Sequence, residues 1–149
     1  LNMIIWIDGD ACPNEIKDIV YRASIKKQIK LNYIANSYQR IPQNQLFSLV
    51  IVKRLPDAAD QYILDNLKQG DIVITADIPL ASEALKKGAP AINPKGIAYT
   101  ESNIREKLAI RNLMEELRSA GTISGGPKPL DNKDKTNFAN ALDRLIHKR

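Results

Sequence analysis

The chain has very few of the residues from which several common catalytic sites are built. Its 149 residues include one cysteine, Cys12, and one histidine, His147. A single cysteine excludes an internal disulfide and a zinc site built from cysteines, and a single histidine leaves histidine-rich metal sites and catalytic triads almost without material. The sequence contains no P-loop and no Gly-x-Gly-x-x-Gly motif, so ATP or NAD use is not indicated.

Long apolar runs are also missing. The sequence has no secretory leader pattern and no stretch of about 18 apolar residues, so we expect a cytoplasmic protein without membrane association. A hydrophobic content of 44% in 149 residues suits one domain with a substantial core. Leu1 and Asn2, which precede Met3, are interpreted as an appended remnant, so the expected single domain spans residues 3–149.

The charge balance favours polyanions as partners. The formal net charge is +5 and the sequence pI is about 9.3, although 17 acidic residues lie among 22 basic ones. Positive charge of this size attracts the phosphate backbone of nucleic acids at neutral pH. We therefore expect a nucleic-acid partner, whereas the oligomeric state cannot be predicted from the sequence.

Short apolar runs alternate with amphipathic segments, which is typical of a parallel sheet covered by helices on both faces. We expect Gly70 and Gly88 to end the second and third helices. The fold class is therefore predicted as α/β, with a mostly parallel central sheet flanked by helices. Strands are predicted at residues 3–8, 31–35, 49–52, 72–76 and 91–92, and helices at residues 13–27, 57–69, 79–87, 102–119 and 134–147, with a loop at 36–45 and an irregular segment at 121–135.

Aspartates gather where these elements begin and end. Asp8 and Asp10 follow the first predicted strand and Asp77 follows the fourth, while Asp57 and Asp60 begin the second helix, three residues apart on one face. Ligands of open α/β sheets bind beyond the carboxyl ends of the strands. Mg²⁺ and Mn²⁺ prefer carboxylate and water oxygens. If the two strands are neighbours, Asp8, Asp57, Asp60 and Asp77 form a predicted Mg²⁺ or Mn²⁺ site.

Helix capping is the alternative interpretation of the aspartates, because Asp8, Asp57 and Asp77 each precede a predicted helix and Asp60 could be a surface charge. Capping explains each residue singly but does not explain why they recur at the same edge of the sheet.

Four further residues are candidates for binding substrate. Thr75 could hydrogen-bond a carboxylate or a phosphate from the end of its strand. Arg40 and Lys95 could border the acidic pocket and contact a phosphate backbone. Lys128 follows the glycine-rich segment Gly125-Gly126-Pro127 and is the fourth candidate.

The same motifs resemble a known family. The sequence is similar to the YaiI/YqxD family of bacterial proteins from Met3 to the last helix, and this family is grouped with PIN-like folds. The resemblance therefore implies a single three-layer PIN-like domain. The motifs that carry it are Asp8-Gly9-Asp10-Ala11-Cys12-Pro13, Pro56-Asp57-Ala58-Ala59-Asp60, Thr75-Ala76-Asp77-Ile78-Pro79-Leu80-Ala81 and Gly125-Gly126-Pro127.

Many PIN-like proteins are metal-dependent nucleases with acidic residues on the first strand, a central helix and a later strand end. By this resemblance the acids are Asp8, Asp57 or Asp60, and Asp77. PIN enzymes often carry a glutamate in the helix, where this chain has aspartates. The fourth acid is left open between Asp10, Asp131 and Asp134.

The predicted activity is hydrolysis of a phosphodiester in RNA, in preference to DNA, with one or two Mg²⁺ or Mn²⁺ ions activating water. Asp8 and Asp77 are the expected metal ligands, and Asp60 or Asp57 would hold or orient the metal and the water. Asp10 completes the set of catalytic candidates, as an acid outside the direct ligands.

Two other functions remain open. Asp8-Gly9-Asp10 after an apolar strand also resembles the first motif of haloacid-dehalogenase-like phosphatases, in which Asp8 would be phosphorylated and Asp10 would act as general acid and base. Thr75 and Lys95 would then bind the phosphate, but the late aspartate pair expected in that family is missing. The third interpretation is a noncatalytic module that binds nucleic acid or protein.

Overall fold

The computed structural model describes residues 3–122 and 129–147, and these form a five-stranded sheet with helices on both faces. All strand pairs are parallel, in the order β3-β2-β1-β4-β5, so the predicted α/β class is confirmed and the sheet is entirely rather than mostly parallel. The strands are β1 (Ile4–Asp8), β2 (Lys30–Ala35), β3 (Phe47–Ile51), β4 (Ile72–Ile74) and β5 (Ala91–Ile92); the helices are the short 3-10 helix η1 (Gly9–Ala11), α1 (Asn14–Lys27), α2 (Ala58–Asn66), α3 (Ile78–Lys86), α4 (Glu101–Ser119) and α5 (Asn132–His147).

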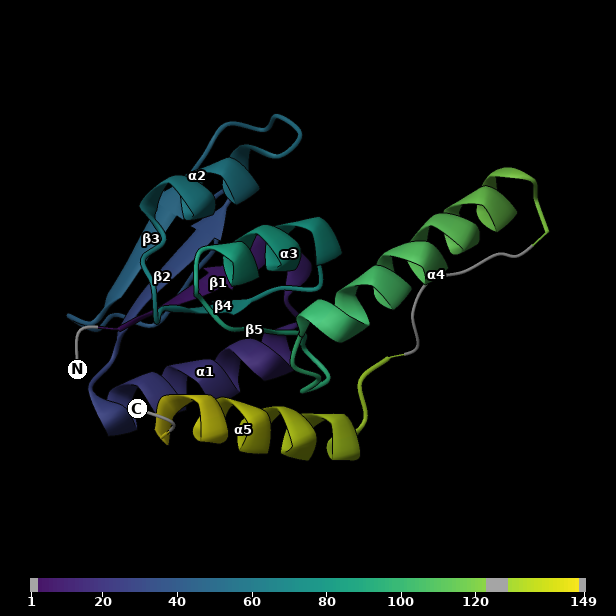
Figure 1. Ribbon diagram of the computed structural model, residues 1–149. Coiled ribbons are helices and arrows are strands. Elements are labelled where there is room, and N and C mark those ends of the chain that lie inside the picture. Colours follow the sequence, from purple (N-terminus) through teal and green to yellow (C-terminus); the bar gives the residue numbers. More distant parts are fainter. Residues whose placement is uncertain (1–2, 123–128, 148–149) are drawn as a thin grey trace.

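The helices form two outer layers. Helices α1 and α5 lie side by side against one face of the sheet, and α2 and α3 cover the other face (Figure 1). Successive side chains of β1 point to opposite faces because a strand has a period of two residues. Ile5 and Ile7 enter the core beneath α1 and α5, whereas Trp6 enters the core beneath α2 and α3. Both faces of the sheet are therefore buried, as expected for parallel strands.

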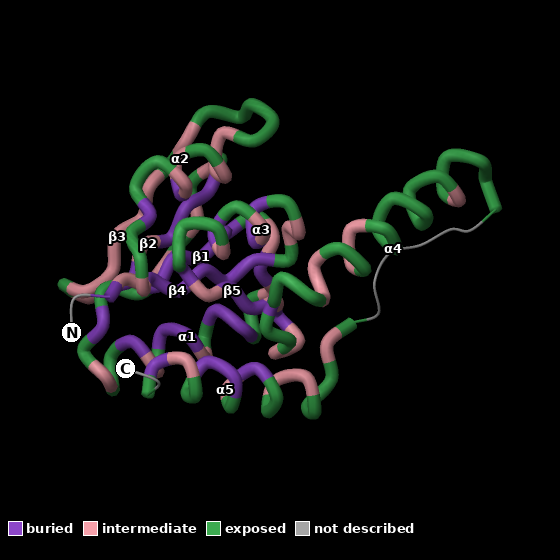
Figure 2. The backbone as a smooth tube through the Cα atoms, viewed as in Figure 1, coloured by how far each residue is buried: buried purple, intermediate pink, exposed green. Residues whose placement is uncertain are grey.

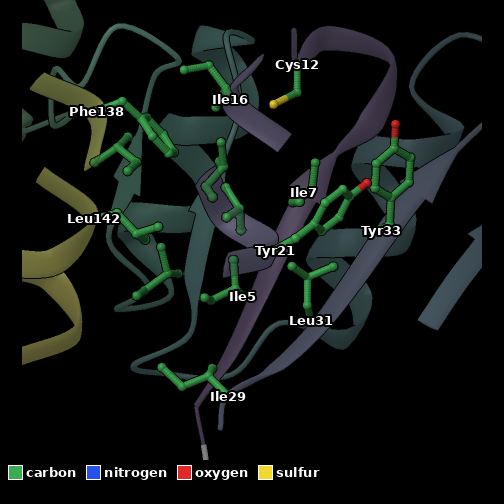
Figure 3. Close-up of a cluster of buried hydrophobic side chains, with 14 of the residues drawn as sticks. Ile5, Ile7, Cys12, Ile16, Tyr21, Ile29, Leu31, Tyr33, Phe138 and Leu142 are labelled. Carbon is green, nitrogen blue, oxygen red and sulfur yellow. The ribbon is translucent and has the colours of Figure 1, made fainter. Parts of the chain in front are cut away.

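The core on the α1 and α5 side is built from aliphatic and aromatic side chains. Figure 3 shows Ile5 and Leu31 of the sheet facing Ile16 of α1 and Phe138 and Leu142 of α5. Phe138 and Leu142 are almost inaccessible to solvent, so one side of α5 is part of this core. This packing fixes α1 directly behind the carboxyl end of β1.

Most predicted elements are present, and the differences at their ends have local causes. Strand β3 begins two residues before the predicted start, at Phe47. Helix α2 ends at Asn66 rather than near residue 69, because Leu67 is extended and its side chain is buried in the core. Gly70 therefore does not close α2 but adopts a positive φ of 90° in the turn before β4, whereas Gly88, with φ of 80°, does follow α3 as predicted.

Helix α4 extends away from the sheet, and none of its 19 residues is buried (Figures 1 and 2). Its start is fixed by a capping box between Thr100 and Asn103. Of its apolar side chains, Ile104 packs against the core, but Leu113 and Met114 are 51% and 38% exposed. No helix in the described residues combines the length and the apolar content that crossing a membrane requires.

Candidate acidic site

The candidate site lies where the connections of the sheet change direction. From β1 the chain adds β2 and then β3 on one side, and it returns to place β4 on the other side of β1. Ile7 of β1 is paired with Ile74 of β4, so the two strands end next to each other. The connections leave these ends in opposite directions, which is the arrangement that opens a ligand crevice in α/β sheets. Asp8 ends β1 at this point, and the predicted pairing of the two strands is confirmed.

Asp8 and Thr75 connect the two strand ends. The Asp8 side chain is buried, with 5% of the residue exposed, and its Oδ2 accepts a 2.8 Å hydrogen bond from the Thr75 hydroxyl. Thr75 Oγ1 in turn accepts a 2.9 Å hydrogen bond from the backbone N–H of Asp77. Burial raises the pKa of Asp8, the Thr75 hydrogen bond lowers it, and the charges of Asp77 and Asp10 raise it further. Thr75 thus binds a carboxylate, one of its two predicted roles.

Asp77 has a structural role that leaves part of its carboxylate available. Its Oδ1 accepts a 3.0 Å hydrogen bond from the backbone N–H of Leu80 and so caps α3. The capping alternative is therefore correct for this oxygen. It does not explain the second carboxylate that lies beside Asp77, which belongs to Asp60 on α2.

Asp60 is the most strongly perturbed of these acids. Burial raises its pKa to about 7, and the negative charges of Asp77, Asp8 and Asp57 contribute to the increase. A hydrogen bond with Asp77 favours the protonated form of Asp60 still further. Asp60 is consequently not a simple surface charge. The carboxylates of β1 and α2 thus lie close enough to the start of α3 for the charge of Asp77 to disfavour the ionisation of both Asp8 and Asp60.

Asp57 occupies the N-cap position of α2, but its side chain makes no capping hydrogen bond. Its backbone has a φ of 64°, in the left-handed region that residues with a Cβ rarely adopt. Capping by its side chain therefore does not explain this aspartate. It is exposed, and its charge acts on Asp60 at the rim of the cluster.

Asp10 is held by the loop that follows β2. Its Oδ2 accepts a 2.9 Å hydrogen bond from the backbone N–H of Asn36, and its Oδ1 accepts a 3.3 Å hydrogen bond from the Gln39 side chain. Gln39 Oε1 is itself bonded by Lys17 Nζ at 3.1 Å and by the Tyr33 hydroxyl. Sequence reasoning missed this network, because it connects η1, α1, β2 and the loop after β2 through polar residues that carry no distinctive spacing.

The remaining candidates for a fourth acid lie at the start of α5. Asp131 and Asp134 accept hydrogen bonds from each other's backbone N–H groups, at distances of 2.8 and 3.1 Å. Neither contributes to the raised pKa of Asp8 or Asp60, whereas Asp10 does affect Asp8. Asp10 is therefore the best placed of the three alternatives.

A cavity of about 1030 Å³ lies beside the acids, between α4 and the carboxyl ends of the strands. Ala76 and Ile78, the residues on either side of Asp77, both line it, and so does Asp10. Lys95 lines the same cavity as Asp10. The other lining residues are Ala11, Cys12, Pro13, Glu15, Asn93, Pro94, Tyr99, Lys107, Ile110, Arg111, Pro129 and Leu130.

Two of the predicted substrate-binding residues are not brought to this cavity by the described structure. Arg40 is exposed in the connection between β2 and β3 and does not line the cavity. Lys128, with Gly125-Gly126-Pro127, lies outside the described residues. Tyr99, which sequence reasoning missed, donates a 3.1 Å hydrogen bond from its hydroxyl to the Thr75 carbonyl and so links the cavity wall to the end of β4.

The acidic side chains at the crevice limit the kind of metal ion that could bind there. Among the described residues, no three histidine, cysteine, aspartate or glutamate side chains are grouped closely enough to hold one ion together. Mg²⁺ usually retains several water ligands and takes only one or two carboxylates, with substrate phosphate completing its coordination. Paired carboxylates at Asp77 and Asp60, with Asp8 nearby, fit that requirement and do not fit a closed structural site.

Comparisons with known proteins give a consistent family assignment. A UPF0178 protein of Psychromonas ingrahamii is 51% identical over 98% of this chain and 97% of the relative. The UPF0178 protein lpg0089 of Legionella pneumophila is 49% identical over 98% of this chain and 99% of the relative. A UPF0178 protein of Maridesulfovibrio salexigens is 48% identical over 97% of this chain and 95% of the relative. No solved structure matches the chain significantly. The family described as "Uncharacterized BCR, YaiI/YqxD family" matches residues 6–148, and the chain belongs to this family.

Proposed function

We propose that the protein is a nuclease that uses Mg²⁺ or Mn²⁺ to hydrolyse phosphodiester bonds, in RNA rather than in DNA. The observation that carries the proposal is the crowding of Asp8, Asp60 and Asp77 at the crevice between β1 and β4, where the pKa of Asp60 is raised to about 7. A fold that holds carboxylates together against their repulsion commonly does so for a function. The three elements that supply these acids are those expected of a PIN-like nuclease.

The hydrogen bonds suggest how the carboxylates divide their roles. Thr75 binds Oδ2 of Asp8 and the cap of α3 uses Oδ1 of Asp77, so each aspartate has a second oxygen that these two bonds do not use. Asp8 and Asp77 would hold the metal, with Asp57 or Asp60 orienting its water. Bound Mg²⁺ or Mn²⁺ would activate water and neutralise charge on the scissile phosphate.

Asp60 is suited to move a proton in this scheme. Because its pKa of about 7 lies near neutral pH, its carboxylate can gain or lose a proton with little driving force. The neighbouring Asp77 favours retention of this proton, because its charge and its hydrogen bond both raise the pKa of Asp60. Asp10 would act from outside the direct metal ligands, where its negative charge raises the pKa of Asp8.

We favour this function over phosphatase chemistry at Asp8. A phosphatase of that kind needs Asp10 to donate a proton, but both Asp10 oxygens accept hydrogen bonds, from Asn36 and from Gln39. Both oxygens of Asp10 are therefore already engaged by the loop that follows β2. Labelling of Asp8 by beryllofluoride, with loss of the label in Asp8→Asn, would instead support the phosphatase.

The test is cleavage of end-labelled single-stranded and structured RNA, with DNA of the same sequences, in Mn²⁺, in Mg²⁺ and in EDTA. The protein should cleave RNA in either metal and stop in EDTA. Asp8→Asn and Asp77→Asn should abolish cleavage, and Asp18→Asn, which changes an exposed aspartate on α1, should not. Equal cleavage by Asp8→Asn would overturn the proposal. RNA binding without any metal-dependent cleavage would favour a noncatalytic module.

A further inference from the structure

We propose that the cavity between α4 and the strand ends receives one unpaired nucleotide of the substrate, adjacent to the nucleotide at the acidic site. This inference rests on the proposed nuclease function and makes single-stranded nucleic acid its substrate class. The cavity volume of about 1030 Å³ is large enough for a nucleotide, since small-molecule sites typically occupy about 300–1,000 Å³.

One wall of the cavity is basic. Lys95, Lys107 and Arg111 line it, and the last two are four residues apart on the same face of α4. Within residues 3–122 and 129–147, neither Lys95 nor Lys107 forms an ion pair with a carboxylate. Arg111 is paired with Glu115 at 3.3 Å, but this pair is exposed and therefore weak. These cations are available to contact phosphate.

The acidic side chains of the cavity come from a different segment of the chain. Asp10 and Glu15 line the side of the cavity formed by the segment from η1 to the start of α1. A phosphate would be repelled there and attracted to the α4 wall. The cavity thus specifies which end of a nucleotide lies against α4, which an evenly charged pocket would not do.

Apolar side chains line the space between the charged groups. Ile78 begins α3, Pro94 follows β5, Ile110 comes from α4, and Leu130 precedes α5. Proteins that bind unpaired bases hold them between apolar or aromatic side chains. A base in a duplex is stacked and paired, so it cannot enter such a cavity. The apolar lining therefore favours a single strand over a duplex.

The cavity adjoins the acidic site. Asp77 lies between Ala76 and Ile78, which both line the cavity, and Asp60 lies beside Asp77. A strand with its scissile phosphate at these carboxylates would therefore place its next nucleotide at the cavity. The Lys107 ammonium lies 6.0 Å from the centre of the Tyr99 ring, and the Tyr99 hydroxyl bonds the Thr75 carbonyl, which connects the basic wall to β4.

The experiment measures binding of a short single-stranded oligoribonucleotide in EDTA, by fluorescence anisotropy over a range of salt concentrations. The variant Lys107→Ala with Arg111→Ala should raise Kd roughly tenfold and reduce the slope of log Kd against log salt by about 0.7 for each lost phosphate contact. The matched control is Arg22→Ala with Lys26→Ala, an exposed pair four residues apart on α1, which should change Kd and slope little.

Competition tests the substrate class. The same sequence as a duplex, and the free mononucleotide, should compete more weakly than the single strand. A duplex or a mononucleotide that competes equally well would overturn the inference, as would a Kd and salt slope unchanged in the α4 variant. Both variants should melt like the native protein, because the substituted side chains are not buried.

The outcomes also separate this inference from the proposed function. Loss of binding in the α4 variant, with no metal-dependent cleavage by the native protein, would support the cavity and refute the nuclease. Metal-dependent cleavage with unchanged binding in the α4 variant would support the nuclease and refute the cavity.

Discussion

Asp8 and Thr75 are 67 residues apart in the chain, and a 2.8 Å hydrogen bond between their side chains connects the ends of β1 and β4. Both residues are buried, so Thr75 is the donor that compensates Asp8 for lost contact with water. The capping of α3 depends on the same hydroxyl, because Thr75 Oγ1 accepts from the backbone N–H of Asp77. One side chain therefore positions two of the candidate acids.

Thr75→Val should destabilise the fold by about 1–3 kcal/mol, because a buried charged group loses its hydrogen-bond donor while the volume of the side chain is nearly unchanged. Urea denaturation would measure the loss. Thr75→Ser, which keeps the hydroxyl, is the matched control and should lose less stability. A Thr75→Val protein as stable as the native one would show that Asp8 does not depend on this bond.

The raised pKa of Asp60 predicts that stability depends on pH. The pKa is raised from 3.8 to about 7 on folding, so the contribution of Asp60 to the free energy of unfolding is fully present below the unfolded-state pKa and is lost as pH rises through the folded-state pKa. Asp60→Asn should therefore gain stability relative to the native protein as pH rises from about 4 to about 7, with no further gain above that range.

Melting temperatures of the native and Asp60→Asn proteins across this pH range would check the sign. Each 1 kcal/mol corresponds to about 2–4 °C for a domain of this size, so a gain of several degrees is expected near neutral pH. Asp65→Asn, an exposed aspartate on the same helix, is the control and should show no such trend. A difference that stays constant with pH would contradict the prediction.

Metal should stabilise the folded protein. Carboxylates crowded at the crevice repel one another. A cation that binds only the folded state raises the free energy of unfolding by about 1.4 kcal/mol when its concentration is ten times Kd, and so raises the melting temperature. Asp8→Asn with Asp77→Asn should reduce the increment from Mg²⁺ or Mn²⁺. Asparagine still caps a helix, so the double variant should remain folded. Equal increments in both proteins would point to nonspecific ionic effects.

Substitutions of basic residues and of acidic residues should have different effects on the binding and the cleavage of RNA. Lys95→Ala should weaken binding, because Lys95 lines the cavity beside the acids. Arg40→Ala should weaken it less, because Arg40 does not line this cavity. Asp8→Asn should stop cleavage and leave binding intact or tighter, since it removes a charge that repels phosphate. Binding by filter retention and cleavage by gel would separate the classes; a parallel loss in both assays would contradict the division of roles.

The position of the acids could be predicted because parallel strands deliver their carboxyl ends to one edge of the sheet. Asp8 and Asp77 each follow an apolar run, and that pattern is local. The raised pKa of Asp60 could not be predicted, because it depends on the distance between α2 and the start of α3. The helical pattern of α2 likewise did not indicate that Leu67 would leave the helix to fill the core.

The cavity could not be predicted from the sequence, for a similar reason. The sequence pattern places Lys107 and Arg111 on the solvated side of an amphipathic helix, and only the packing of α4 against the rest of the fold brings them to the same cavity as Asp10. Tyr99 has no motif of its own, and its link to Thr75 depends on how β5 and the following turn pack.

The lack of buried residues in α4 implies uneven cooperativity within one domain. Local opening is easiest where few apolar contacts are lost, so the amide hydrogens in the distal half of α4 should exchange with solvent long before those of β1, whose residues Ile5 and Ile7 are inaccessible. A strand bound between α4 and the sheet would add contacts that local opening must break. Slower exchange in α4 would then report occupancy of the cavity, without any change in the sheet.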